Sequence, residues 1–248
     1  MTKVKLNPLT LPERLKELAV RLYWKFRTPV YGVLLGGPGA GKGTLAEKLA
    51  PELGISHIST GNLLRREVAN NTEIGRFVDP IMVKGDFVPN EITVYLLAKE
   101  LCLWKNRHGT LLDGFPRSVE QANLLDKLLK NWRLGLNAVV FIEVPEKDLI
   151  ERITGRRTCS NSTCGSTFHI IFNPPKVEGI CDKCGSPLIK RKDDNETTIG
   201  ERLKLFNKQI APLVDLYRKQ RLIHTVTSTN NGGIDDVSKQ ARKFFDTH

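Results

Sequence analysis

Residues 36–44 read Gly-Gly-Pro-Gly-Ala-Gly-Lys-Gly-Thr, a run of glycines around one lysine. A glycine-rich turn between a strand and a helix can point successive backbone N–H groups inward, and the helix N-terminus adds positive potential. The run therefore predicts a phosphate-binding loop in which Lys42 reaches the β- and γ-phosphates of a nucleotide. A flexible linker is the alternative, but the flanking segments fit a strand and a helix. The general motif has a hydroxyl residue directly after the lysine, whereas Gly43 stands here and Thr44 follows.

A second candidate group lies in residues 111–122, which read LLDGFPRSVEQA. Asp113 ends an expected strand, where its carboxylate could orient Mg²⁺ through water, although a turn or a helix cap is the alternative. Arg117 follows near the sheet edge at which open α/β folds bind ligands. Phosphoryl transfer needs positioned nucleotides, clustered cations and Mg²⁺, so these residues beside a phosphate loop indicate that chemistry.

Further arginines occur at both ends of segment 157–194. They are Arg152, Arg156, Arg157, Arg191 and Arg202. Cations at both hinges of a lid would reach the phosphates and exclude water in the same closing motion. Surface ion pairs with nearby acids such as Asp193 are the alternative, above all for Arg157.

Segment 157–194 also holds four cysteines in the spacing Cys-x4-Cys, sixteen residues, Cys-x2-Cys. They are Cys159, Cys164, Cys181 and Cys184. Two cysteine pairs at such spacing are typical of a structural zinc site. Disulfides are the alternative, but no sequence pattern indicates an oxidising compartment. Cys102 is expected in the core, and His57 and His169 are expected to be structural because the sequence offers them no catalytic partner.

The rest of the chain alternates short apolar runs with longer helical segments. The expected strands are 30–35, 55–58, 110–112, 138–144 and 222–226, and the expected helices include 90–104 and 119–134. This alternation predicts an α/β fold with a doubly wound, parallel, five-stranded sheet of the P-loop type. Segment 157–194 interrupts the pattern and is expected to be an insertion.

The first 28 residues predict an amphipathic helical extension that packs against the body. Apolar residues recur there at helical spacing, namely Leu11, Leu15, Leu18, Leu22 and Phe26. Thr10 and Glu13 have the spacing of a capping box. A transit peptide would be rich in Arg and Ser and poor in acids, whereas this segment contains Glu13 and Glu17. Its basic residues keep an organellar or membrane-surface role open.

The formal charge of +11 and the pI near 9.5 favour anionic partners such as nucleic acid, an anionic membrane or small phosphorylated ligands. A zinc-ribbon nucleic-acid-binding module on an NTPase is therefore one candidate. The insertion lacks a dense Lys/Arg run with interleaved aromatic residues, so we expect no nucleic-acid partner. No apolar run reaches the roughly 18–20 residues of a membrane span. We expect a soluble monomer in the cytoplasm, with mitochondria as the alternative.

Five segments in order resemble adenylate kinases and related nucleoside monophosphate kinases. They are 36–44, 58–68, 111–122, 172–184 and 191–203. The resemblance, which runs from about Tyr31 to the C-terminus, implies reversible Mg²⁺-dependent phosphoryl transfer from ATP to AMP, giving two ADP. GTP:AMP phosphotransfer is the alternative, and a pyrimidine monophosphate kinase fits less well because those relatives generally have a short lid. The family's long lids usually carry Cys-x2-Cys as their first pair, whereas this chain has Cys-x4-Cys.

The same resemblance divides residues 29–248 and assigns their roles. It implies a core of 29–58, 89–156 and 195–248, an AMP-binding flap of 59–88 and a zinc-bearing lid of 157–194. On the ATP side it places Gly37, Gly39, Ala40, Gly41, Lys42, Gly43, Thr44, Arg152 and Arg156. On the AMP side it places Thr60, Arg65, Asp86, Phe87, Val88, Gly114, Phe115, Pro116, Arg117, Gln121, Arg191 and Arg202. The expected catalytic set is Lys42, Asp113, Arg117, Arg156, Arg191 and Arg202. By itself, Arg65 would be interpreted as part of a solvated helix face.

Overall fold

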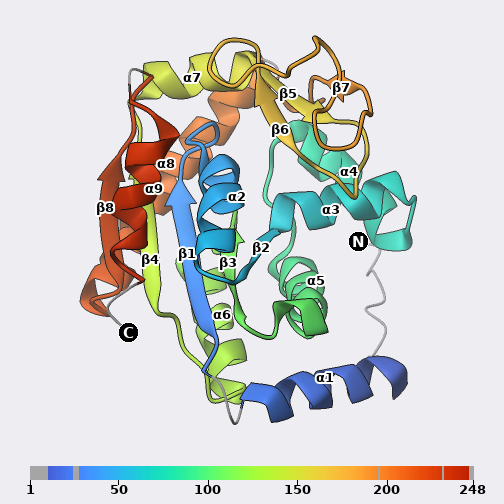
Figure 1. Ribbon diagram of the computed structural model, residues 1–248, viewed down its shortest axis with the longest axis vertical. Coiled ribbons are helices and arrows are strands. Elements are labelled where there is room, and N and C mark those ends of the chain that lie inside the picture. The colour runs from blue at the N-terminus through green and yellow to red at the C-terminus, as the bar shows by residue number, and fades with distance from the viewer. Residues whose placement is uncertain (1–10, 25–27, 195, 231, 246–248) are drawn as a thin grey trace.

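The computed structural model describes residues 11–24, 28–194, 196–230 and 232–245, and its centre is a five-stranded parallel sheet (Figure 1). The strands are β1 (Val30–Gly36), β2 (Ser56–Ser59), β3 (Gly109–Asp113), β4 (Ala138–Glu143) and β8 (Ile223–Thr227). Their order across the sheet is β2-β3-β1-β4-β8. Each strand lies where its apolar run predicts it, so the expected α/β class and the five-stranded parallel sheet are confirmed.

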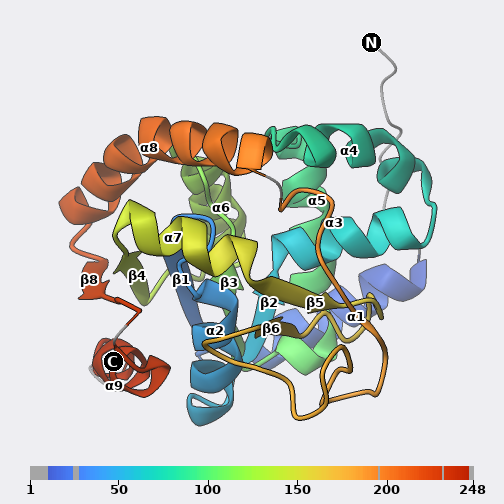
Figure 2. The same cartoon turned by 90° about the horizontal axis from the view of Figure 1, so that it is seen from above.

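Helices cover both faces of the sheet, as a doubly wound arrangement requires (Figure 2). On one face lie α2 (Lys42–Glu52) and α9 (Ile234–Arg242), and on the other lie α5 (Asn90–Leu101), α6 (Val119–Asn131) and α8 (Glu196–Lys219). Along β1, Tyr31 and Val33 join the core of one face while Leu34 joins the core of the other. This alternation follows from the two-residue period of a strand. Both faces of the sheet are therefore packed, as its continuous apolar strands predict.

Two smaller substructures stand at the end of the sheet where the strands finish. Helices α3 (Thr60–Ala69) and α4 (Glu73–Lys84) follow β2, and a three-stranded antiparallel sheet is formed by β5 (Arg156–Cys159), β6 (Thr167–His169) and β7 (Leu188–Ile189). Helix α7 (Glu146–Thr154) leads into the second of these. They fall within the segments expected to be a flap and a lid, a division that stays a prediction.

Helix α1 (Leu11–Trp24) lies at the end of the molecule opposite β5, β6 and β7 (Figure 1). It is attached through Val20, which is 1% exposed, and through an ion pair of 3.0 Å between Glu13 Oε1 and Lys99 Nζ. The hydroxyl of Tyr23 lies 3.2 Å from Nδ1 of His108, beside the short η1 helix (Trp104–Asn106). The helix therefore contacts the body through these residues.

The apolar stripe of α1, however, does not make that contact. Its leucines face solvent, with exposed fractions of 59% for Leu15, 53% for Leu18 and 46% for Leu22. Thr10 and Phe26 of the expected pattern lie outside the described residues. Among the described residues, no helix combines the length and the apolar character needed to cross a membrane.

Candidate active site

The predicted site residues meet because the strands that carry them are parallel. In the sheet register Asp113 pairs with Leu34 of β1 on one side and with Ser59 of β2 on the other. The carboxyl ends of β1, β2 and β3 therefore lie side by side. The glycine-rich loop, the start of α3 and the Asp113 segment all begin at this edge, which is where open α/β sheets bind ligands.

The glycine-rich loop after β1 requires glycine at specific positions. Gly39 and Gly41 have φ of 84° and 85°, in the left-handed region that side chains disfavour. A Cβ atom on Gly39 would also lie 2.7 Å from the carbonyl oxygen of Leu149. Helix α2 starts at Lys42, directly after Gly41, which has no side chain with which to cap it. The first N–H groups of the helix are thus left for an anion.

The side chain of Lys42 folds back over this loop. Its ammonium donates to the carbonyl oxygens of Gly36 at 2.8 Å and Gly37 at 2.9 Å. Burial lowers the pKa of Lys42 to about 8, against the opposing effect of the Asp113 carboxylate and with the help of nearby arginines such as Arg117. A phosphate at the loop would restore the charged form of Lys42, because an adjacent anion favours the ammonium.

Asp113 lies next to the loop as an ionised carboxylate. Burial alone would raise its pKa, but the His57 imidazole and the Lys42 ammonium outweigh burial and hold that pKa well below its usual range. His57 Nε2 lies 3.8 Å from Asp113 Oδ2, and within the described part of the chain this buried nitrogen has no hydrogen-bond partner. A buried, ionised carboxylate beside a phosphate loop has the chemistry of a Mg²⁺-orienting group.

His57 is therefore a residue whose setting the sequence interpretation missed. It was expected to be structural, yet it points at the carboxylate of Asp113 across the β2–β3 pair. The sequence feature that could have indicated this contact is the position of His57, two residues before the end of β2. There its side chain lies on the same strand face as that of Ser59. That signal becomes informative only once β2 is known to neighbour β3.

A cavity of ≈ 520 Å³ extends from the loop to the antiparallel sheet of β5, β6 and β7. Seven cationic residues line it, namely Lys42, Arg65, Arg117, Arg152, Arg156, Arg191 and Arg202. Among the lining residues that the structure describes, only Glu47 and Asp113 are acidic. Burial lowers the pKa of Arg191 well below its usual range, and the charges of Arg65 and Arg156 lower it further. The surplus of crowded positive charge makes this cavity an anion site.

Two carboxylates hold part of the arginine cluster. Arg156 forms a bidentate ion pair with Asp194, which is 1% exposed, and Arg202 donates to Asp193 at 2.7 Å. Arg156 and Arg202 therefore form the ion pairs with nearby acids that the sequence left open as an alternative. Arg157, for which an ion pair is the main alternative, instead donates from its guanidinium to the backbone carbonyl of Arg156 at 2.8 Å.

Arg152 is fixed on the cavity wall by the segment that follows β8. Its Nε donates to Asn230 Oδ1 at 2.8 Å, and both terminal nitrogens lie 3.2 Å from Ser228 Oγ. The backbone N–H of Asn230 donates to Asp148 at 3.0 Å. A planar guanidinium held in this way suits stacking against a nucleotide base.

The residues predicted for AMP form a second group around the loop after β3. Thr60 Oγ1 donates to the Gly114 carbonyl at 3.0 Å, and Arg117 Nε donates to the same oxygen at 2.8 Å. Arg65 donates to Asn62 Oδ1 at 2.5 Å. A smaller cavity of ≈ 90 Å³ lies here, with Phe87, Pro116 and Arg117 in its lining. The two cavities share residues that include Lys42, Gly114, Arg117 and Arg202.

Six of the predicted residues line neither cavity. They are Gly37, Thr60, Asp86, Val88, Phe115 and Gln121. Phe115 is fully buried in the core, and Gln121 accepts from the Arg117 backbone at 2.8 Å while donating to Asn90 at 2.8 Å. Their assignment to AMP stays a prediction. Conversely, Asn62, Phe168 and Phe172 line the larger cavity although the sequence had not proposed them.

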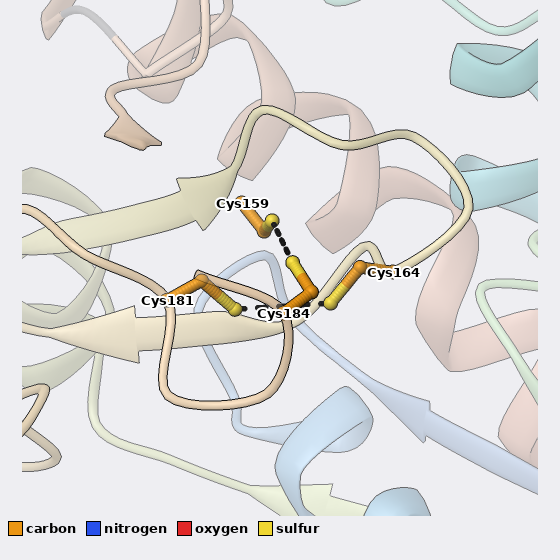
Figure 3. A group of neighbouring side chains, drawn as sticks. All are labelled: Cys159, Cys164, Cys181 and Cys184. Carbon is orange, nitrogen blue, oxygen red and sulfur yellow. Dashed lines mark hydrogen bonds between the residues drawn. The ribbon is translucent and has the colours of Figure 1, made fainter. Parts of the chain in front are cut away.

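The four cysteines of segment 157–194 form one cluster (Figure 3). All four Sγ atoms lie within 4.8 Å of one another, with 3.4 Å between Cys159 and Cys184 and 3.7 Å between Cys164 and Cys181. The structure has no disulfide among these four cysteines, and one cluster of four sulfurs favours a metal site over two disulfides. A tetrahedral ion with metal–sulfur bonds of about 2.3 Å places its thiolates about 3.8 Å apart, so the cluster fits such an ion. Cys102, by contrast, is buried in the core as expected.

The cysteine-bearing segment also contacts the main body through exposed side chains. Lys183, between two of the clustered cysteines, lies 2.5 Å from Glu47 Oε2 of helix α2. Gly165 packs against Asn62 of α3, since a Cβ atom on this glycine would lie 3.0 Å from the Asn62 amide nitrogen. The segment therefore covers the large cavity from two sides.

Comparison with known proteins agrees with this geometry. The family model described as adenylate kinase matches residues 34–222. The chain is 46% identical over 199 residues to an adenylate kinase of Carboxydothermus hydrogenoformans. These 199 residues make up 80% of this chain and 92% of that protein. It is 43% identical over 211 residues to one of Caldicellulosiruptor saccharolyticus (85% and 96%) and 44% identical over 209 residues to one of Streptomyces avermitilis (84% and 94%). This chain belongs to the adenylate kinase family.

Proposed function

We propose that the chain catalyses reversible transfer of the γ-phosphoryl group of ATP to AMP, giving two ADP. The observation that carries this proposal is the cavity in which the glycine-rich loop, Asp113 and the arginine cluster converge. Phosphoryl transfer mainly requires a protein to position two nucleotides and to stabilise the negative charge that is distributed over the phosphate oxygens. This cavity has residues for both tasks. The relatives named above carry the same activity in their names.

The ATP phosphates would lie in the glycine-rich loop, where the first N–H groups of α2 and the Lys42 ammonium bind them. The guanidinium of Arg152, held by Ser228 and Asn230, faces the donor base. Arg156, Arg191 and Arg202 surround the transferred group and stabilise charge that develops on its oxygens. The chain needs no covalent intermediate, because direct transfer between two bound nucleotides accounts for the reaction.

The acceptor would lie between α3 and the loop after β3. Arg65 and Arg117 bind its phosphate there, with Phe87 on the side of the base. Mg²⁺ travels with ATP, and Asp113 and Thr44 are the residues that would hold it, directly or through water. When bound, it neutralises phosphate charge between the two nucleotides. His57 keeps the Asp113 carboxylate in place for that task.

The ion in the cysteine cluster is proposed to be Zn²⁺, held by Cys159, Cys164, Cys181 and Cys184. The lid has little hydrophobic core, since Cys159, Phe168 and Cys181 are its only clustered buried apolar residues in the described part of the chain. A metal that binds only the folded lid contributes its binding free energy to folding. Zinc would therefore replace the missing core and keep the lid rigid enough to exclude water.

A coupled phosphotransfer assay across ATP, GTP, AMP, CMP and UMP tests the proposal. We expect turnover with AMP and, among donors, a preference for ATP, with GTP as the alternative donor. Turnover confined to CMP or UMP, or no transfer at all, would contradict it. Filter binding to nucleic acid at graded salt provides the second arm, because tight and salt-dependent binding without phosphotransfer would favour the zinc-ribbon module. A cytoplasmic monomer stays our prediction, and the bacterial relatives lend no support to the mitochondrial alternative.

A further inference from the structure

Helix α1 is attached to the protein by the face that its sequence marks as polar. Glu13 pairs with Lys99, Val20 is buried, and Glu17 lies one turn from each on the same side of the helix. A surface helix ordinarily turns its apolar stripe toward the core. Here the stripe is left outside, with each of Leu15, Leu18 and Leu22 close to half exposed or more.

The charges around this helix are unevenly distributed. Residues 1–28 contain seven Lys or Arg and two Glu, a formal net charge of five out of the chain's +11. Both glutamates fall on the face that meets the body. Arg14 is exposed, and the helical period places it beside Leu18, one turn along the leucine stripe. The outer side of α1 is consequently both apolar and cationic.

We propose that α1 is a peripheral docking surface for an anionic lipid bilayer. An amphipathic helix with leucines on one side and Lys/Arg beside them lies in the membrane interface, with its apolar residues among the acyl chains and its cations at the headgroups. The fourteen residues of α1 span about 21 Å, long enough to lie flat along such an interface.

The same observations disfavour a second copy of this chain as the occupant. Two α1 stripes packed together would bring two N-terminal segments, each with a formal net charge of five, toward one another. An anionic bilayer removes this repulsion, because each cation near an anionic surface contributes about 1 kcal/mol to binding. No residue of α1 lines either described cavity, so a docked segment would find no pocket there.

The position of α1 is compatible with catalysis at a membrane. The helix lies at the end of the molecule opposite β5, β6 and β7 (Figure 1), and residues of β5 and β6 line the large cavity. A protein resting on α1 would keep that cavity directed toward the aqueous phase. Docking would then place nucleotide conversion beside the membrane without blocking entry to the site.

Co-sedimentation of the full chain with vesicles tests the proposal. We expect binding to phosphatidylcholine vesicles containing 30% phosphatidylglycerol, weaker binding at high salt, and little binding to pure phosphatidylcholine. The triple variant Leu15→Ser, Leu18→Ser, Leu22→Ser should bind at least about 100-fold more weakly, since each buried leucine accounts for about a tenfold change. Val83→Ser is the matched control, because Val83 is an exposed apolar residue (40%) on helix α4.

Both variants alter exposed side chains, and their thermal unfolding should match that of the wild type. Phosphotransfer by vesicle-bound wild type should stay within about twofold of the free enzyme. Absence of binding to anionic vesicles, or equal binding by the triple variant, would overturn the proposal. A concentration-dependent dimer that the triple variant loses, without vesicle binding, would assign the stripe to a second copy instead.

Discussion

The pKa of Lys42 leads to a quantitative prediction about ATP binding. Burial lowers this pKa to about 8 before nucleotide binds, whereas an ammonium against bound phosphates should return to about 10.5 or above. At pH 8.5 about a quarter of the unliganded molecules carry the Lys42 proton, against nearly all of the liganded ones. Binding should therefore add about 0.7 proton to Lys42 at pH 8.5 and almost none to Lys42 at pH 6.5.

The sign of the pH effect follows from the same pKa. Phosphate binds the charged lysine, so raising the pH through 8 removes the form that binds. Affinity should fall about tenfold between pH 7 and pH 9, because the free protein loses its proton while the complex keeps it. The ATP phosphates contribute little to this change above pH 8, since their last ionisation lies near pH 6–7.

Calorimetric titration with a non-hydrolysable ATP analogue measures the uptake directly. Titrations at pH 8.5 in buffers of different ionisation enthalpy give the number of protons as the slope of heat against that enthalpy. Lys42→Met is the control, because it keeps the aliphatic stem and removes the titrating group, so its slope should be near zero. A wild-type slope below about 0.2, or an unchanged slope in Lys42→Met, would refute the reasoning.

Three further predictions follow from the site. Arg65→Ala should raise the KM for AMP at least tenfold, roughly the loss of one hydrogen bond to a charged group, and leave the KM for ATP within about twofold; a selective ATP defect in steady-state kinetics would mean that the two nucleotide pockets are assigned in reverse. Cys164→Ser should remove the bound metal and lower the Tm by about 5 °C or more, while ATP binding persists. Elemental analysis of wild type purified without added metal should give one zinc per chain; less than about 0.2 metal per chain with four free thiols would eliminate the site, and stoichiometric iron would change the metal but keep the geometry. His57→Ala should raise the Mg²⁺ concentration for half-maximal rate several-fold with little change in kcat at saturating Mg²⁺; an unchanged Mg²⁺ titration would show that His57 does not position Asp113.

The sequence alone predicted those features of the fold that depend on residues close together in the chain. The five parallel strands coincide with apolar runs that turn residues interrupt, and the glycine-rich loop needs backbone conformations that only its own residues determine. The cysteine spacing likewise predicted a cluster, because pairs at short separation must come together when one ion binds both.

Features that depend on neighbours from distant parts of the chain were not predictable in this way. The proximity of His57 and Asp113 follows from the strand order, in which β3 separates β2 from β1. The helical period of residues 11–24 identified a leucine stripe but not the direction it faces. That direction is set by contacts such as Glu13 with Lys99, residues far apart in sequence. Similarly, the ion pairs of Arg156 and Arg202 with Asp194 and Asp193 depend on how the lid folds back onto α8.

The contact between Lys183 and Glu47 has a consequence for how quickly ADP can leave. Both side chains are substantially exposed, at 56% and 35%, and ion pairs of this kind contribute only about 0–1 kcal/mol. If segment 157–194 opens as the proposed lid, this ion pair offers little resistance to the departure of product. Dissolved ions screen exposed pairs, so rising ionic strength should shorten the residence time of ADP. The ion pair between Lys183 and Glu47 would therefore favour the closed position of the proposed lid without preventing its opening.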